Sequence, residues 1–483
     1  MRLPIVAFFL LATLAIAQTK SLPPKSSYEQ DETAKSEKQY PPELVNELTA
    51  LREAALADEY AYRQVAHLTE NIGARPSGSP QAQAAVDYVA EELRKLGLEV
   101  RLEEVRVPHW IRGIETAELV EYPGQAAGTK QKIVLTALGA STPTSAEGLT
   151  AEVVAVNNFD ELKNLGRQGV AGKIVLFNTH FDKDKAAAGF AGEAYGEAVA
   201  YRAKGAKAAV ELGAIASLVR SVGGADYRLP HTGWGEPAGI PAGAVTSEDA
   251  DLIAHLAAQG KVRMHVILTS QNASEVLSYN VVADLKGSEH PEQVVIVSGH
   301  LDSWDLGTGA IDDGAGVAVA METAELIQRL HLHPKRTIRV IAWMDEENGG
   351  RGHDAYATAH RTEFANHVAA IESDLGASHP LGFDAKISAN ALPWLKPAQE
   401  ILRSFGANLI KITDQSPGSD IAPMAKAGIP AFGIMQDGRT YFNYHHTAAD
   451  TLDKIVPREL RENAAAMAVM GYALANLPAT LPR

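Results

Sequence analysis

Short, continuous apolar runs dominate the second half of the chain. Three of them, at residues 294–298, 337–344 and 368–373, have the length and composition of strands that are buried on both faces. Between the first two, residues 315–330 carry apolar side chains at helical spacing. Strands that alternate with a helix in this way predict an α/β fold with parallel strands in its central sheet.

The first part of the chain adds helices to this picture. A helical pattern runs from residue 42 to 57, and a second helix is expected over 80–96, with Ser79 as its N-cap and Pro80 in its first turn. The remaining expected elements are strands at 98–107, 279–283, 410–413 and 430–435 and a closing helix at 457–477.

The texture of the sequence changes near residues 122–124. From about residue 125 to 275 the chain is rich in Ala and Gly, and short apolar runs predict strands at 153–156, 173–177 and 214–219. We therefore expect a separate inserted unit, and a main domain that is divided into residues 43–124 and 276–483.

The N-terminus has the pattern of a secretory signal peptide, which predicts a secreted or periplasmic protein. Residues 3–15 are apolar and are followed by a small-residue cleavage site, so residues 1–17 are expected to be removed. Residues 18–42 are polar and lack an apolar period, which predicts a disordered segment or a removable pro-segment.

Composition narrows the range of partners. The net charge of −15 argues against nucleic acid and anionic membranes. No other apolar stretch is long enough to cross a membrane. The chain contains no Cys, and a domain of this size can form a sufficient core without disulfides.

Acidic and imidazole side chains lie where the predicted strands end. The carboxyl ends of such strands open into the crevice where α/β sheets bind ligands. Carboxylates and imidazoles without thiols suit zinc in a hydrolytic site. The candidates are His300 after the first apolar strand, Asp312 before the helix, Glu346 and Glu347 after the second strand, Asp374 after the third, and His446 near the C-terminus.

Each candidate also has an ordinary structural interpretation. Asp312 could cap the helix that follows it, and the pair Glu346 and Glu347 could form a solvated turn. A serine nucleophile is not supported, because no Gly-x-Ser-x-Gly motif occurs. Six such residues in order, each at a strand or loop end, favour the metal interpretation.

The chain resembles metallopeptidase family 28, the co-catalytic zinc aminopeptidases and glutamate carboxypeptidases. The resemblance runs from about residue 50 to the C-terminus. It implies a zinc-peptidase fold with a mixed, mostly parallel sheet flanked by helices, and an inserted protease-associated domain. The matching segments are residues 297–305, Asp312-Asp313-Gly314, Glu346-Glu347, Glu372-Ser373-Asp374 and His445-His446.

The resemblance also implies a role for each candidate. Two Zn²⁺ ions are expected per chain, one held by His300 and Asp374 and the other by Glu347 and His446. Asp312 would bridge the two ions, and Glu346 would act as general base toward a hydroxide held between them.

Four further residues are expected to support the ligands or to contact substrate: Asp302, His445, His231 and Ser419. Asp302 lies two residues after His300 and could accept a hydrogen bond from the other nitrogen of that ring. His445 stands where relatives often carry a Tyr, so His445, Tyr444 and zinc remain alternatives for stabilising an oxyanion. The loop at 230–233, which contains His231, could reach over the cleft.

The predicted function is that of a secreted dinuclear zinc exopeptidase that hydrolyses dipeptides or small peptides. The sequence leaves open whether it removes residues from the amino or the carboxyl end, and whether it forms a homodimer. A catalytically inactive receptor-like protein and a single-zinc glutaminyl cyclase are the alternatives of other classes. The intact ligand set and Glu346 argue against both.

Overall fold

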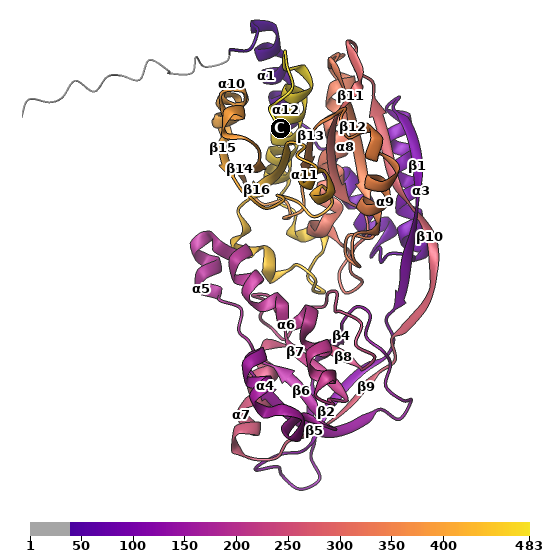
Figure 1. Ribbon diagram of the computed structural model, residues 1–483, viewed down its shortest axis with the longest axis vertical. Helices are drawn as coiled ribbons and strands as arrows, with labels where there is room; N and C mark the ends of the chain where they lie inside the picture. Colours follow the sequence, from indigo (N-terminus) through magenta and orange to yellow (C-terminus); the bar gives the residue numbers. More distant parts are fainter. Residues whose placement is uncertain (1–38) are drawn as a thin grey trace, which may run out of the picture. The chain divides into compact units, whose positions relative to one another are not determined.

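The computed structural model describes residues 39–483 of the chain (Figure 1). The expected signal peptide at 1–17 and most of the polar segment at 18–42 lie outside the described residues. The end of that segment is folded, because Tyr40 is buried and its hydroxyl donates a hydrogen bond to the carbonyl of Trp394 at 2.7 Å. Tyr40 therefore already belongs to the packed part of the chain, and α1 (Pro42–Leu56) follows it.

The predicted α/β architecture is confirmed by a mixed eight-stranded sheet. Its strand order is β1-β10-β12-β11-β13-β16-β14-β15. The four neighbours β12, β11, β13 and β16 run parallel, whereas β1 and β10 pair antiparallel at one edge. The strands are β1 (Glu99–Ile111), β10 (Gln271–Leu285), β11 (His290–His300), β12 (Arg336–Trp343), β13 (His367–Glu372), β14 (Pro380–Lys386), β15 (Leu409–Ile412) and β16 (Ala431–Gln436).

Helices cover both faces of this sheet, which explains why its central strands are mostly apolar. Along β11, Val295 and Val297 pack in the larger core with α8 and α12, while Val294 and Ile296 face the smaller core of α9 and α11. No helix within residues 39–483 is long and apolar enough to span a membrane. The helices of this domain are α1 (Pro42–Leu56), α2 (Tyr60–Ala66), α3 (Pro80–Lys95), α8 (Ala315–Arg329), α9 (Arg351–Ala359), α10 (Leu392–Leu402), α11 (Ala422–Lys426) and α12 (Pro457–Asn476).

A second eight-stranded sheet is formed by the segment between β1 and β10, which we call the insert (residues 115–268). Its strand order is β3-β2-β9-β5-β6-β7-β8-β4. The strands are β2 (Glu115–Glu121), β3 (Gln131–Ile133), β4 (Leu135–Ala137), β5 (Leu149–Val156), β6 (Ile174–Phe177), β7 (Ala216–Arg220), β8 (Ala242–Val245) and β9 (Arg263–Leu268). Its helices are α4 (Phe159–Val170), α5 (Lys183–Lys185), α6 (Ala191–Glu211) and α7 (Ser247–Gln259).

The two edges of this segment differ from the change in sequence texture at residues 125 and 275. β2 lies before residue 125 and pairs with β9 of the second sheet. Residue 275 falls inside β10, a single strand that pairs with β1 as a long ribbon (Figure 1). Composition could not reveal either edge, because a continuous strand pair joins the two sheets.

The insert also contacts the main domain far from that ribbon. The backbone N–H of Gly224 donates to the carbonyl of Phe442 at 2.9 Å, and that of Thr232 donates to the carbonyl of His446 at 2.9 Å. These bonds attach two loops of the insert to the chain around the last predicted ligand.

Candidate metal centre

Parallel pairing brings the predicted ligands together at one edge of the first sheet. His300 is the last residue of β11, Glu347 follows β12 and Asp374 follows β13. β11 lies between β12 and β13 in the sheet, with His300 in register with Trp343 and Ser298 in register with Glu372. The carboxyl ends of three neighbouring strands therefore carry three of the candidates.

Asp312 joins the candidates into two groups. One of its oxygens lies 3.1 Å from Nε2 of His300, which is also 3.2 Å from Oδ1 of Asp374. The other oxygen lies 3.2 Å from Nε2 of His446, which is also 3.0 Å from Oε2 of Glu347. Two three-residue groups that could hold a metal therefore share Asp312, with one carboxylate oxygen directed to each.

The neighbour of Asp312 performs the capping role that Asp312 could have had. Asp313 accepts a hydrogen bond from the backbone N–H of Gly316 at 2.9 Å and one from that of His300 at 3.0 Å. Asp450 holds the preceding loop, because its Oδ1 accepts from Ala310 and Ile311, both at 2.8 Å. Asp312 is thus left to face the two imidazoles.

Burial dominates the ionisation of these acids. It raises the pKa of Glu347 to about 7, and it raises the pKa of Glu346, which the charge of Asp374 raises further. Burial acts the same way on Asp312, but the neighbouring histidines hold its pKa well below the ordinary value. Burial lowers the pKa of His446, but the charges of Glu347 and Asp312 and their hydrogen bonds to the ring together outweigh burial and raise the pKa to about 9.

The donor set fits divalent zinc. Nε2 of each imidazole faces two carboxylate oxygens, although a neutral ring can donate only one hydrogen bond from that atom. Oε1 of Glu347 is buried and has no hydrogen-bond partner among the described residues. A cation between nitrogen and oxygens satisfies both features, and imidazole and carboxylate are ordinary zinc ligands.

Asp302 supports the site in a different way from the one predicted. Nδ1 of His300 contacts the backbone carbonyl of Asp302 at 3.0 Å, and the carboxylate is farther, at 3.8 Å. That carboxylate instead accepts from the N–H groups of Asp345 at 2.8 Å and Glu346 at 3.1 Å, and from Ser77 at 2.9 Å. Asp302 therefore orients His300 through its carbonyl and holds the glutamate turn through its side chain.

A cavity of about 380 Å³ opens beside the two groups. Glu346 lines it and is only partly buried, in keeping with access to a bound molecule. Ser419 also lies on its wall, in a position to contact such a molecule. The other lining residues are Asp312, Glu347, Gly349, Asp374, Leu375, Tyr441, Phe442, His445 and His446 from the main domain and Tyr195, Arg202 and Trp234 from the insert.

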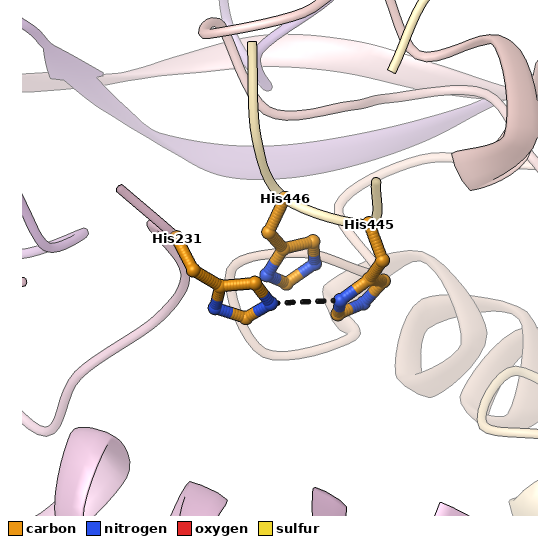
Figure 2. A group of neighbouring side chains, drawn as sticks. All are labelled: His231, His445 and His446. Carbon is orange, nitrogen blue, oxygen red and sulfur yellow. Dashed lines mark hydrogen bonds between the residues drawn. The ribbon is translucent and has the colours of Figure 1, made fainter. Parts of the chain in front are cut away.

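His231 and His445 meet behind this cavity. Nε2 of His231 lies 3.0 Å from Nδ1 of His445 (Figure 2). His445 lines the cavity, but His231 is fully buried and does not. Burial lowers the pKa of both rings well below the ordinary value. Loop 230–233 therefore approaches the site as expected, but its His231 contacts His445 and does not contact the cavity.

Arg202 was not predicted from the sequence. It lies on α6 of the insert, far along the chain from every predicted ligand, and it is only 8% exposed. Its Nη1 donates to the hydroxyl of Tyr195 at 2.6 Å and lies 3.2 Å from Nδ1 of His446. No local motif marks this arginine, because α6 reaches the site only through the tertiary fold.

Two other charged residues near the predicted motifs are engaged elsewhere. Asp305 is bound by Arg112, whose Nε and Nη2 lie 2.8 and 2.6 Å from the two carboxylate oxygens. Arg439 pairs with Asp437 beside it, at 2.8 Å from Nε. Neither Asp305 nor Arg439 lines the cavity.

Known proteins are similar to this chain in sequence and in fold. Residues 280–470, which contain all six candidates, match the family described as peptidase family M28. Carboxypeptidase Q of Xenopus laevis is 38% identical over 435 residues, which cover 88% of this chain and 88% of the relative. The crystal structure of a peptidase M28 precursor from Shewanella amazonensis superposes with a TM-score of 0.84 at 36% identity, covering 91% of this chain and 98% of that one.

A more distant structure shares the fold. The zinc aminopeptidase of Bacillus subtilis superposes with a TM-score of 0.62 at 21% identity, covering 85% of this chain and 93% of that one. Identity of 36–38% over about nine-tenths of this chain is a stronger relation than fold alone. The protein belongs to peptidase family M28 and is a metallopeptidase.

Proposed function

We propose that the protein is a dinuclear zinc exopeptidase that hydrolyses dipeptides or other small peptides. The observation that carries this proposal is the position of Asp312, which directs one oxygen to His300 and Asp374 and the other to His446 and Glu347. A single carboxylate that is shared by two such groups suits a site for two ions, whereas a site for one ion does not require it.

The residues of the chain then have distinct tasks. Bound zinc polarises a peptide carbonyl and lowers the pKa of water. Glu346 lies on the cavity wall next to the ligand Glu347, where it can accept the proton of the attacking water and pass it to the leaving amine. Asp302 keeps that glutamate turn in place through the backbone of Glu346.

We further propose that the substrate has a free carboxylate near the scissile bond. Every carboxylate on the cavity wall is already assigned to metal or to proton transfer, which leaves none for a free amine. Arg202 also lines the cavity. Its hydrogen bonds to other residues of the segment 39–483 all involve Nη1, and its Nε is buried with no hydrogen-bond partner in that segment. A guanidinium with unused donors suits a carboxylate. This favours a carboxypeptidase or dipeptidase, as the name of the Xenopus laevis relative indicates for that protein.

We propose that the insert is the expected protease-associated domain. Tyr195, Arg202 and Trp234 give it three positions on the cavity wall, so it would help to choose the substrate. The predicted signal peptide supports secretion, and the N-terminal sequence of the mature protein would test it.

Metal analysis combined with a peptide panel tests the function. The purified protein should contain about two zinc ions per chain and should hydrolyse a dipeptide with free ends. N-acetylation should be tolerated better than amidation of the C-terminus. One zinc with cyclase activity would indicate the glutaminyl cyclase alternative, and two zinc ions without hydrolysis of any peptide would indicate a receptor-like protein. Preference for the amidated peptide would reverse the direction to that of an aminopeptidase.

A further inference from the structure

A histidine pair links the insert to the wall of the cavity. His231, in the loop after β7, places Nε2 3.0 Å from Nδ1 of His445 (Figure 2). Two backbone hydrogen bonds hold His231 and the residue after it in place. Its own N–H donates to Oγ of Ser221 at 3.0 Å, and the N–H of Thr232 donates to the carbonyl of His446 at 2.9 Å. The geometry of the pair is therefore imposed by the fold.

The second nitrogen of His445 points to the reacting region. Nε2 of His445 lies 3.5 Å from Oδ2 of Asp312, and the ring lines the cavity. A distance of 3.5 Å is too long for a strong hydrogen bond. An N–H at this nitrogen is thus close to the carboxylate yet still available to an oxygen atom of a bound molecule.

The surroundings decide which nitrogen of His445 carries the proton. In a neutral imidazole one nitrogen donates and the other accepts. A lone pair on Nε2 would face the carboxylate of Asp312, which is unfavourable, whereas an N–H there is attracted to it. Nδ1 must then accept, and Nε2 of His231 must donate. The remaining nitrogen of His231, Nδ1, is buried and has no hydrogen-bond partner within residues 39–483, and an unpaired acceptor is tolerated better than an unpaired N–H.

We propose that His231 is a positioning residue that holds His445 with its Nε2–H directed into the cavity, where this N–H donates to the substrate oxygen that gains negative charge during hydrolysis. His231 acts only through His445, because it has no surface on the cavity. The inference rests on the proposed peptidase function. It assigns to the insert a contribution to the rate of the reaction in addition to substrate choice.

The test uses the zinc-loaded enzyme and three substitutions. His231→Phe keeps a ring against Tyr195 and His446 but removes the donor. We expect kcat to fall roughly 10–100-fold, the usual cost of losing an orienting partner, with KM and zinc content unchanged. His231→Gln, which keeps an N–H donor, should recover most of kcat. His265→Phe is the matched control in the insert, because His265 contacts Thr150 at 2.8 Å and does not line this cavity.

A double-substitution cycle with His445→Phe separates positioning from a general structural effect. If His231 acts through His445, then His231→Phe should cause no further loss in the His445→Phe background. An equal loss in both backgrounds would overturn the proposal. Failure of every variant and of the wild type to cleave peptides would instead overturn the peptidase function.

A measurement without turnover tests the same inference. Nitrogen-15 NMR of the zinc-loaded protein, with histidines labelled and His445 assigned by substitution, reports which ring nitrogen is protonated. We expect the proton on Nε2 of His445 in the wild type and a mixture of both forms in His231→Phe. A proton on Nδ1 of His445 in the wild type would overturn the assignment, whatever the activity.

Discussion

The metal ligand candidates lie in the main domain, and some of the residues beside them come from the insert. The two regions place their side chains at the site in different ways. His300, Glu347 and Asp374 follow three neighbouring strands of one sheet, and their positions are a direct result of parallel pairing. Arg202 and His231 come from a helix and a loop of the insert. No local pattern marks Arg202, whereas the loop that contains His231 is expected from the sequence to lie near the cleft. Parallel pairing brings the three candidates together within the main domain, and the insert adds Arg202 and His231 beside them.

We expect this difference to separate metal binding, by the main domain, from substrate selection, by the insert. The acids at the strand ends are buried, and burial raises the pKa of Glu347 to about 7. The insert adds a cation, Arg202, at the edge of the same cavity. Substitutions in the sheet region should therefore change metal content, and substitutions in the insert should change kinetics while the metal stays bound.

The largest effect is expected at the residue shared by both groups. Asp312→Asn removes the charge that both proposed ions would require, so zinc should fall from the expected value of about two ions per chain to one or fewer, and hydrolysis should be lost. Elemental analysis and a dipeptide assay measure both. Chelated wild type should regain activity when zinc is added, and the variant should not. A variant with two zinc ions and normal turnover would contradict the bridging role.

The adjacent glutamates should separate chemistry from metal binding within the sheet region itself. Glu346→Gln should lower kcat roughly 10²–10⁴-fold, the usual contribution of a general base, with zinc retained. Glu347→Gln should lose zinc, because Oε2 of Glu347 lies 3.0 Å from the other ligand His446. If both variants lose zinc to the same extent, then the two roles are not separate.

A smaller and more selective effect is expected for Arg202→Gln in the insert. A hydrogen bond to a charged group contributes about 1.5–3 kcal/mol, so kcat/KM for a dipeptide with a free carboxylate should fall by roughly 10–100-fold. The value for the C-terminal amide should change little, and zinc should stay bound. Arg439→Gln is the control, because Arg439 is exposed and paired with Asp437. Equal losses for both peptides would argue against carboxylate recognition.

The smallest effect on catalysis is expected for an acid of the main domain outside the cavity. Glu322 is fully buried on α8, accepts one hydrogen bond from Ala61 at 2.9 Å, and burial raises its pKa from 4.5 to about 8. The folded state therefore binds the proton more tightly than the unfolded state, so this residue makes stability fall as the pH rises from about 4.5 to 8. Thermal unfolding of Glu322→Gln should lack this part of the decline, with kcat unchanged. Identical pH profiles would show that Glu322 stays ionised.

Much of the main domain could be predicted because its signals are local. The apolar runs at 294–298, 337–344 and 368–373 correspond to β11, β12 and β13, and residues 315–330 to α8. Ser79 accepts a hydrogen bond from the N–H of Ala82 at 3.0 Å, as expected of an N-cap. The spacing predicts that the carboxylate of Asp302 contacts His300, but the backbone carbonyl of Asp302 makes this contact. Sequence spacing does not distinguish a carboxylate from the carbonyl of the same residue.

The sequence by itself determined the α/β fold class and the set of acids and imidazoles at the strand ends, because apolar period and strand termination are properties of neighbouring residues. Only the tertiary structure decided that Asp312 is shared between two groups, that Asp313 caps the helix in its place, that Arg202 contacts His446, and that His231 contacts His445. These contacts join residues far apart in the chain, 214 positions in the case of His231 and His445. Pairing over such distances depends on how the loops and helix of the insert contact the main domain, which no local pattern encodes.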